Sequence, residues 1–246
     1  MKTMHHVLAG ETVGLITAHP DDHLIHAHSL EAARYAANGV HELIATQGRG
    51  STLNYRRAEG FDVRGGQRSQ EARAAAALLG IQSVRQLDAR DGNLTTESAS
   101  VVPATARWLI EREISLVLTL GGLTDHPDHS ATTGIAQAAA RAATEYTGQP
   151  IRIFAVHANG AGKYHTEATP DSMARAYQAA ALHGSQFLLS QTVRPDWPIV
   201  PGGFSAHPDT AAGLGQYPIL FDASYSEYGP VAPAGAPPEI ALAASR

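Results

Sequence analysis

The sequence predicts an α/β protein, built on a Rossmann-like, mostly parallel sheet with helices on both faces. Three observations support this fold class. Short apolar runs alternate with segments of helical periodicity over most of residues 13–182. Most connections between them are short. Two of the apolar runs are followed by clusters of histidine and aspartate, and the carboxyl ends of parallel strands share one edge of a sheet. We therefore expect both clusters to meet in one site at that edge.

The first elements are read directly from the apolar pattern. Residues 13–18 predict a buried strand, and residues 29–38 predict a helix that ends at Gly39. A second strand is expected over residues 40–46. Residues 47–66 are rich in glycine and arginine and have no period, which indicates a loop long enough to form a lid over a site.

The same alternation continues along the chain. An alanine-rich helix should end at Gly80, residues 88–93 have the composition of a turn, and Asp171 is placed to cap the last helix. Further helices are expected over residues 69–79, 102–112, 130–146 and 171–182, and further strands over residues 84–87, 114–120 and 151–157.

The alternation weakens near the carboxyl end. We expect residues 1–190 to form the catalytic α/β domain and residues 191–246 to form an extension, partly irregular and packed on the same domain. Residues 229–246 are rich in proline and alanine, which is typical of a surface tail or a partner-binding arm.

Size and composition narrow the class of protein. The 246 residues are compatible with one α/β domain. The net charge of −5 argues against a nucleic-acid partner. Because the chain has no cysteine, a disulfide framework, thiolate zinc ligands and a cysteine nucleophile are excluded. No apolar run has the length of a membrane span and none resembles a secretion signal, so we expect a cytoplasmic protein, with a homo-oligomer allowed.

The two clusters contain the residue types of a catalytic metal site. His19, Asp22 and His129 would supply two imidazoles and one carboxylate, a ligand set that leaves room for water and substrate. Asp21 would lie beside the metal and could take a proton from a metal-bound water. His126, one helical turn before His129, could stabilise an oxyanion or protonate a leaving group.

These clusters also resemble a known family. The runs Ala18-His19-Pro20-Asp21-Asp22 and His126-Pro127-Asp128-His129 are similar to the paired signature of the PIG-L/LmbE-like de-N-acetylase superfamily. That superfamily includes N-acetylglucosaminyl-phosphatidylinositol de-N-acetylases and mycothiol-pathway deacetylases. Residues 68–80, Asp91-Gly92 and residues 183–186 resemble other family elements. The resemblance, over about residues 13–186, implies a zinc-dependent amidohydrolase that removes an acetyl group from an N-acetylated amino sugar or its conjugate. Iron or another divalent metal is the alternative to zinc.

The resemblance implies a role for each residue of the site. It makes His19, Asp22 and His129 the metal ligands, Asp21 the general base, His126 the oxyanion or acid group, and Arg68 and Asp91 substrate-binding residues. For Arg68, a salt bridge to Glu71 or another acid is an equal alternative. The expected partner is a small amino-sugar substrate, without nucleic acid or a membrane span.

Two positions depart from the family pattern and keep other interpretations open. The chain has His23 where the family usually has glutamate, and His28-Ser29 where many members have a glycine pair that lines the sugar pocket. His23, His26 and His28 could instead form a second metal site. The alternatives to a deacetylase are a catalytically silent sugar- or metal-binding protein of the same fold and, ranked lower, a non-haem iron oxygenase, which uses the same ligand types.

Overall fold

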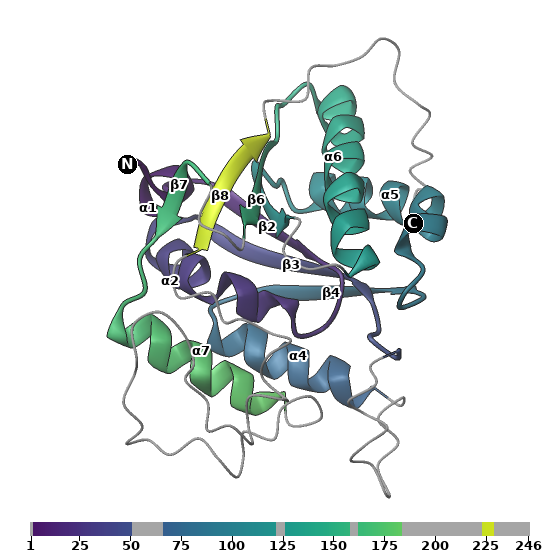
Figure 1. Cartoon of the computed structure of the whole chain (residues 1–246). Helices are drawn as coiled ribbons and strands as arrows, with labels where there is room; N and C mark the ends of the chain where they lie inside the picture. Colours follow the sequence, from purple (N-terminus) through teal and green to yellow (C-terminus); the bar gives the residue numbers. More distant parts are fainter. Residues whose placement is uncertain (1, 51–65, 122–125, 158–161, 184–222, 229–246) are drawn as a thin grey trace, which may run out of the picture.

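The computed structural model describes residues 2–50, 66–121, 126–157, 162–183 and 223–228. They form an eight-stranded sheet with the order β1-β7-β8-β6-β5-β2-β3-β4 (Figure 1). The strands are β1 (Lys2–Thr3), β2 (Thr12–Thr17), β3 (Gly39–Thr46), β4 (Ser83–Ala89), β5 (Leu116–Leu120), β6 (Arg152–His157), β7 (Tyr164–Thr166) and β8 (Ala223–Tyr228). The pairings along β4-β3-β2-β5-β6 are all parallel, and β8 runs antiparallel to β6 and β7. The predicted fold class, an α/β protein with a mostly parallel sheet, is confirmed.

Helices cover both faces of this sheet. The helical elements are α1 (Met4–Leu8), η1 (Asp22–His26), α2 (Ala27–Ala36), α4 (Gln67–Leu78), α5 (Leu94–Glu111), α6 (Pro127–Thr147) and α7 (Pro170–Leu182). Figure 1 shows α5 and α6 on one face and α2, α4 and α7 on the other. Strand β2 explains this arrangement, because Leu15 and Ile16 are both fully buried and point into different apolar clusters. Within the described ranges, no helix combines the length and hydropathy needed to cross a lipid bilayer.

Several predicted boundaries were wrong by a few residues. Helix α2 occupies Ala27–Ala36, two residues earlier than predicted. Helix α5 begins at Leu94, eight residues before the predicted start, and it contains Pro103. The start was missed because threonine and serine dominate its first turns, although the buried Leu94 and Val101 are spaced by two helical turns.

The predicted cap of α7 was also wrong. Thr169, not Asp171, caps the helix: the Thr169 hydroxyl accepts a hydrogen bond from the Ser172 amide at 3.1 Å, and the Ser172 hydroxyl accepts one from the Thr169 amide at 2.8 Å. The reason is Pro170, which favours the first helical position and so places the cap one residue before itself.

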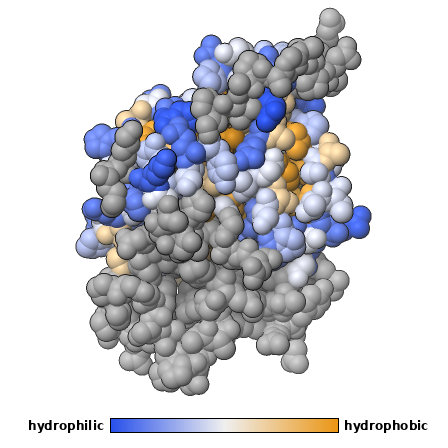
Figure 2. Space-filling view, turned by 45° about the horizontal axis from the view of Figure 1, so that its top comes forward, coloured by the Kyte–Doolittle hydropathy of each residue, from blue (hydrophilic) through white to orange (hydrophobic). Residues whose placement is uncertain are grey.

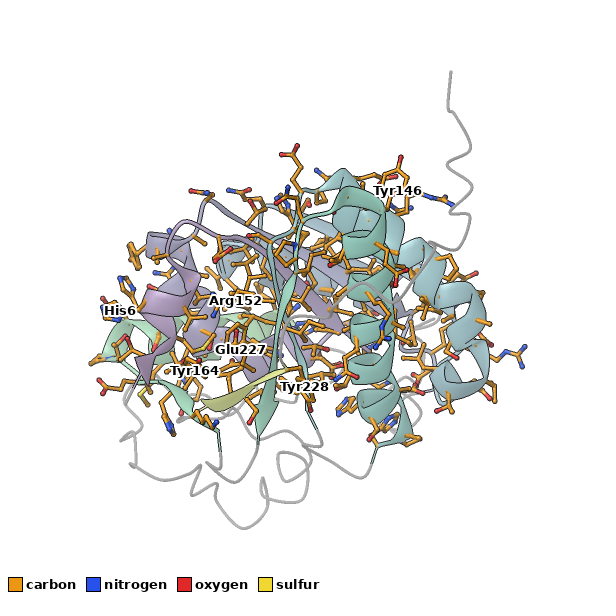
Figure 3. All side chains as sticks on the ribbon, turned by 90° about the horizontal axis from the view of Figure 1, so that it is seen from above. His6, Tyr146, Arg152, Tyr164, Glu227 and Tyr228 are labelled. Atoms are coloured by element: carbon orange, nitrogen blue, oxygen red, sulfur yellow. The ribbon has the colours of Figure 1, made fainter. Side chains whose placement is uncertain are left out.

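Strand β8 lies in residues 191–246, where the sequence analysis predicted no strand. Figure 3 shows Arg152, Tyr164 and Glu227 gathered on β6, β7 and β8. Glu227 accepts hydrogen bonds from Arg152 at 3.0 Å and from the Tyr164 hydroxyl at 2.9 Å, so one side chain bridges both neighbouring strands.

The division of the chain at residue 190 remains a prediction. Most of the expected loop over residues 47–66 and the tail over residues 229–246 lie outside the described residues.

The described residues visible on one face of the molecule are mostly polar. Figure 2 shows hydrophilic residues over most of the coloured part of one face, with apolar residues in a smaller area. The large apolar side chains most exposed among the described residues are Tyr35, Tyr146 and Leu182, at 72%, 50% and 41%. They lie on α2, α6 and α7, respectively, three separate helices.

Candidate active site

The candidate site lies where the central strands β2 and β5 end. These strands pair in parallel, so their carboxyl ends lie at the same edge of the sheet. Strand β2 ends at Thr17, and the first cluster follows in the turn that leads into η1. Helix α6 begins after β5, with His126 as its N-cap residue and Pro127 in its first turn. The strand order therefore explains why two clusters that are far apart in the sequence meet.

Asp22 lies between the other two predicted metal ligands, His19 and His129. Its carboxylate is fully buried, and one oxygen, Oδ2, accepts hydrogen bonds from the backbone amides of Ala18 and His19 at 3.0 and 2.7 Å. The same oxygen lies 3.5 Å from His19 Nδ1, and the other oxygen lies 3.2 Å from His129 Nε2. Asp22 Oδ1 is thus buried and faces an imidazole nitrogen. A buried carboxylate oxygen left in this state beside imidazoles is suited to a cation.

His126 joins the same histidine cluster. The ring centroids of His19, His126 and His129 lie 4.7, 5.3 and 5.2 Å from one another. One nitrogen from each of the three rings lies within 4.8 Å of the others, which is close enough to share an ion. A second group with this property consists of His19, Asp91 and Asp128. Among the described residues, His19 thus belongs to both groups, whereas Asp22 of the predicted ligand set belongs to neither.

The electrostatics of this cluster favour a positive charge. Burial lowers the pKa of His19, but the Asp22 carboxylate, followed by Asp128 and Asp91, outweighs burial and holds that pKa well above the usual value. Burial likewise raises the pKa of Asp22, but His129 and His19 outweigh it and keep the pKa of this carboxyl well below its usual range. The carboxylates around His19 therefore stabilise a positive charge at this position, which a divalent cation could supply.

Asp21 has different surroundings from Asp22. The Arg68 side chain donates a hydrogen bond from NH2 to Asp21 Oδ1 at 2.8 Å and another from NH1 to the Gly48 carbonyl. Arg68 and Asp21 are both buried, with 3% and 1% exposure. Asp21 Oδ2 has no hydrogen-bond partner among the described residues. These two hydrogen bonds of Arg68 are thus with the protein's own carboxylate and backbone, and its substrate-binding role remains a prediction.

Asp128 was not assigned a role by sequence reasoning. Its Oδ2 accepts a hydrogen bond from the Gly92 amide at 2.6 Å and lies 3.3 Å from His19 Nε2, and its Oδ1 accepts one from the Leu94 amide at 3.0 Å. Asp91, predicted to bind substrate, lies 3.2 Å from the same nitrogen of His19. The position of Asp128 in the second cluster could have suggested a role in the site. Its backbone partner Gly92, however, lies in a turn 36 residues away in the sequence.

The three histidines after the first cluster do not gather around an ion. Their hydrogen-bond partners are Glu42 for His23, Tyr225 for His26 and Ser172 for His28. Among the described residues, these three are absent from the groups that could share a metal, so the second site considered as an alternative is not formed there. Ser29 bonds Thr166 and Tyr225 at 2.7 and 2.6 Å. This part of α2 is thereby tied to β7 and β8.

A comparison with protein-family models identifies one family. The model of the PIG-L family, described as GlcNAc-PI de-N-acetylase, matches residues 15–140, just over half of the chain. A search of curated proteins found no match. Among solved structures, N,N'-diacetylchitobiose deacetylase from Pyrococcus horikoshii is 22% identical, with a TM-score of 0.60, and the match covers 72% of this chain and 71% of that one.

Two further structures share the fold. A conserved protein from Thermus thermophilus is 22% identical, with a TM-score of 0.59 and coverage of 72% of this chain and 81% of that one. The 4-carboxy-2-hydroxymuconate hydratase from Pseudomonas putida is 16% identical, with a TM-score of 0.60 and coverage of 88% and 95%. At these identities the likeness establishes the fold.

Proposed function

Because the chain belongs to the PIG-L family, whose model is described as GlcNAc-PI de-N-acetylase, we propose that it hydrolyses the acetamido group of an N-acetylated amino sugar or sugar conjugate. One observation supports this function most strongly. Asp21 is buried beside the His19–Asp22–His129 cluster, is held by Arg68 through one oxygen, and keeps its other oxygen without a partner among the described residues. A carboxylate in this state is suited to act as a general base.

We assign His19, Asp22 and His129 as the residues that hold a divalent metal, with zinc as the first choice and iron as the alternative. Imidazole nitrogens and a carboxylate oxygen suit either ion. When bound, such an ion lowers the pKa of a water molecule and polarises the amide carbonyl. His126 is left out of this set because it is the most exposed of the three histidines and serves as the cap of α6.

Both proton transfers are assigned to Asp21. Asp21 Oδ2 takes a proton from the attacking water, and Arg68 holds the carboxylate by Oδ1 during this transfer. Asp21 then delivers the proton to the leaving nitrogen as the C–N bond breaks, so that water and amide become acetate and a free amine.

His126 is prepared to donate a hydrogen bond. Its Nδ1 accepts from the Asp128 amide at 3.3 Å, so the hydrogen of the neutral ring is on Nε2. Burial, and then the nearby His19 and His129, lower the pKa of His126, which keeps the ring neutral near pH 7. A neutral Nε2–H can stabilise the developing oxyanion without a permanent charge.

Acetate release tests this function directly. Purified protein is stripped with a chelator, reloaded with zinc or iron, and incubated with a panel of N-acetylated hexosamines, their disaccharides and their inositol conjugates. Enzymatic measurement of acetate and fluorescent detection of the free amine should show equal amounts of both, only after metal is restored. Full activity in stripped protein, or tight binding without acetate release from every panel member, would contradict the proposal.

A hydratase is the second candidate. The muconate hydratase matches 88% of this chain, against 72% for the chitobiose deacetylase, so its fold accounts for more of the chain. Adding water across a carbon–carbon double bond conjugated to a carboxylate requires the same base and oxyanion groups. Loss of the ultraviolet absorbance of 4-carboxy-2-hydroxymuconate, without acetate release in the panel, would favour this candidate.

A further inference from the structure

Three buried ionisable side chains form a continuous hydrogen-bonded chain behind the site. Glu42, in the middle of β3, places both carboxylate oxygens 3.2 Å from Nδ1 of His23. The Nε2 atom of His23 lies 2.9 Å from Nε2 of His183, at the carboxyl end of α7. All three residues have 0% exposure. This chain connects β3 with η1 and with the carboxyl end of α7.

Glu42 has a second hydrogen-bond partner, at the end of β2. The Thr17 hydroxyl donates a hydrogen bond to Glu42 Oε1 at 3.2 Å. Thr17 is the last residue of β2, and His23 directly follows Asp22. The Glu42 side chain therefore forms hydrogen bonds with the two residues that flank residues 18–22, the segment that carries His19, Asp21 and Asp22.

The burial of the Glu42 carboxylate is energetically unfavourable unless partners compensate for it. A carboxylate inside an apolar parallel strand loses its hydration. Neighbouring positions of β3 such as Leu43 and Ile44 are fully buried apolar residues. An apolar residue at position 42 would satisfy packing alone, so packing does not explain the glutamate.

The hydrogen bonds also fix ring orientations. A carboxylate can only accept, so Nδ1 of His23 donates to Glu42. The two Nε2 atoms of His23 and His183 then share one hydrogen between them. Each ring is thus held at a defined angle, and the backbone on either side of Asp22 is held with it.

We propose that Glu42 is a positioning residue for the metal-binding segment, acting through Thr17 and His23 to hold residues 18–22 in the conformation in which His19 and Asp22 bind a cation. The proposal rests on the metal site of the proposed function but not on the identity of the substrate. Partners that orient metal ligands from outside the ligand set contribute to affinity, and their removal typically costs about 10–100-fold.

Metal affinity of Glu42 variants tests the proposal. Glu42→Leu and Glu42→Gln are compared with wild type by competition for zinc with a chromophoric chelator and by the visible absorption of the cobalt-loaded protein. We expect about 10–100-fold weaker zinc binding for Glu42→Leu, with an altered cobalt spectrum. Glu42→Gln, which can still accept from His23, should show a smaller loss in the same direction.

Glu31→Gln is the matched control. Glu31 is a buried glutamate of α2 that forms an ion pair with Arg175 of α7, 2.7 Å away. Its substitution should change stability but leave zinc affinity and the cobalt spectrum at wild-type values. Circular dichroism identifies the variants that fold. If Glu42→Leu does not fold, the zinc affinity of Glu42→Gln alone tests the proposal.

The outcomes separate this proposal from the proposed function. Wild-type zinc affinity in a folded Glu42 variant overturns the positioning role and leaves the deacetylase proposal untouched. Weaker zinc binding in Glu42 variants supports the positioning role even if wild type releases no acetate. A wild-type protein that takes up no divalent metal overturns both.

Discussion

At the residue scale, the adjacent carboxylates Asp21 and Asp22 are divided by their hydrogen bonds. Asp22 is fixed by backbone amides, whereas Asp21 is held by Arg68 through one oxygen. We predict that Asp21→Asn lowers kcat/KM by about 10²–10⁴-fold, because the amide cannot accept the proton of the attacking water. Metal content should stay at the wild-type value, since Asp22 is held by backbone amides and faces His19 and His129. Steady-state kinetics and metal analysis of the same preparations measure both quantities.

Asp88→Asn is a control for this variant. Asp88 is an exposed carboxylate near the end of β4, so its substitution should leave kinetics and metal content unchanged. Wild-type turnover by Asp21→Asn would remove Asp21 from the mechanism. Loss of metal together with activity would indicate that Asp21 supports the metal site instead.

Sequence reasoning could bring together the residues of the two clusters because strand ends in a parallel sheet share an edge. It could not assign Asp128 or Glu42. Asp128 depends on backbone amides in a distant turn, and such partners leave no pattern in a sequence. Glu42 did leave a signal, since a single carboxylate in an apolar run is costly unless it has a partner. The identity of that partner, His23, appears only once β2 and β3 are paired.

At the scale of elements, Asp128 joins the beginnings of α5 and α6. It lies in the first turn of α6 and accepts a hydrogen bond from the amide of Leu94, the first residue of α5. Burial alone would raise the pKa of Asp128, but hydrogen bonds from His19 and from the amides of Gly92 and Leu94 outweigh burial and lower it. Both helices are therefore held by an ionised carboxylate.

We predict that Asp128→Asn lowers the free energy of unfolding of metal-stripped protein by about 1.5–3 kcal/mol at neutral pH, the usual range for hydrogen bonds to a charged group. Because the folded pKa is lowered, this stabilisation is complete above the unfolded pKa of about 3.9 and is lost as the pH falls through the folded value. The difference between wild type and variant should therefore shrink below about pH 4. Urea unfolding followed by circular dichroism measures it. A difference that stays constant with pH would show that the charge of Asp128 is not responsible.

Element boundaries show where local signals compete. Long apolar strands were placed to within about two residues, because burial on both faces gives an unbroken apolar run. Helix α5 was cut short because its first turns consist of weak helix formers, and packing of Leu94 and Val101 outweighs their preferences. Strand β7 has only three residues, too few to establish an alternating pattern.

At the scale of the whole molecule, β8 was hidden for a different reason. It lies between β6 and β7 in the sheet although it comes 57 residues after β7 in the chain, from Thr166 to Ala223. Such an insertion is decided by tertiary contacts, among them the fully buried Tyr225, whose hydroxyl lies 2.6 Å from Ser29 Oγ and 3.2 Å from His26 Nδ1. These contacts link the last described strand to the elements that follow the first cluster.

The proposed metal also acts on the whole molecule, because its ligands come from the segment after β2 and from α6. An ion that binds only the folded chain stabilises it, by about 2.7 kcal/mol at a free concentration one hundred times Kd. In a chain of this size, that corresponds to a rise in Tm of about 5–10 °C. We predict this rise when zinc is added to stripped protein, measured by calorimetry. His129→Ala should abolish most of it, whereas His5→Ala, an exposed histidine of α1, should retain it. An unchanged Tm for wild type at saturating zinc would mean that the two clusters meet without forming a metal site.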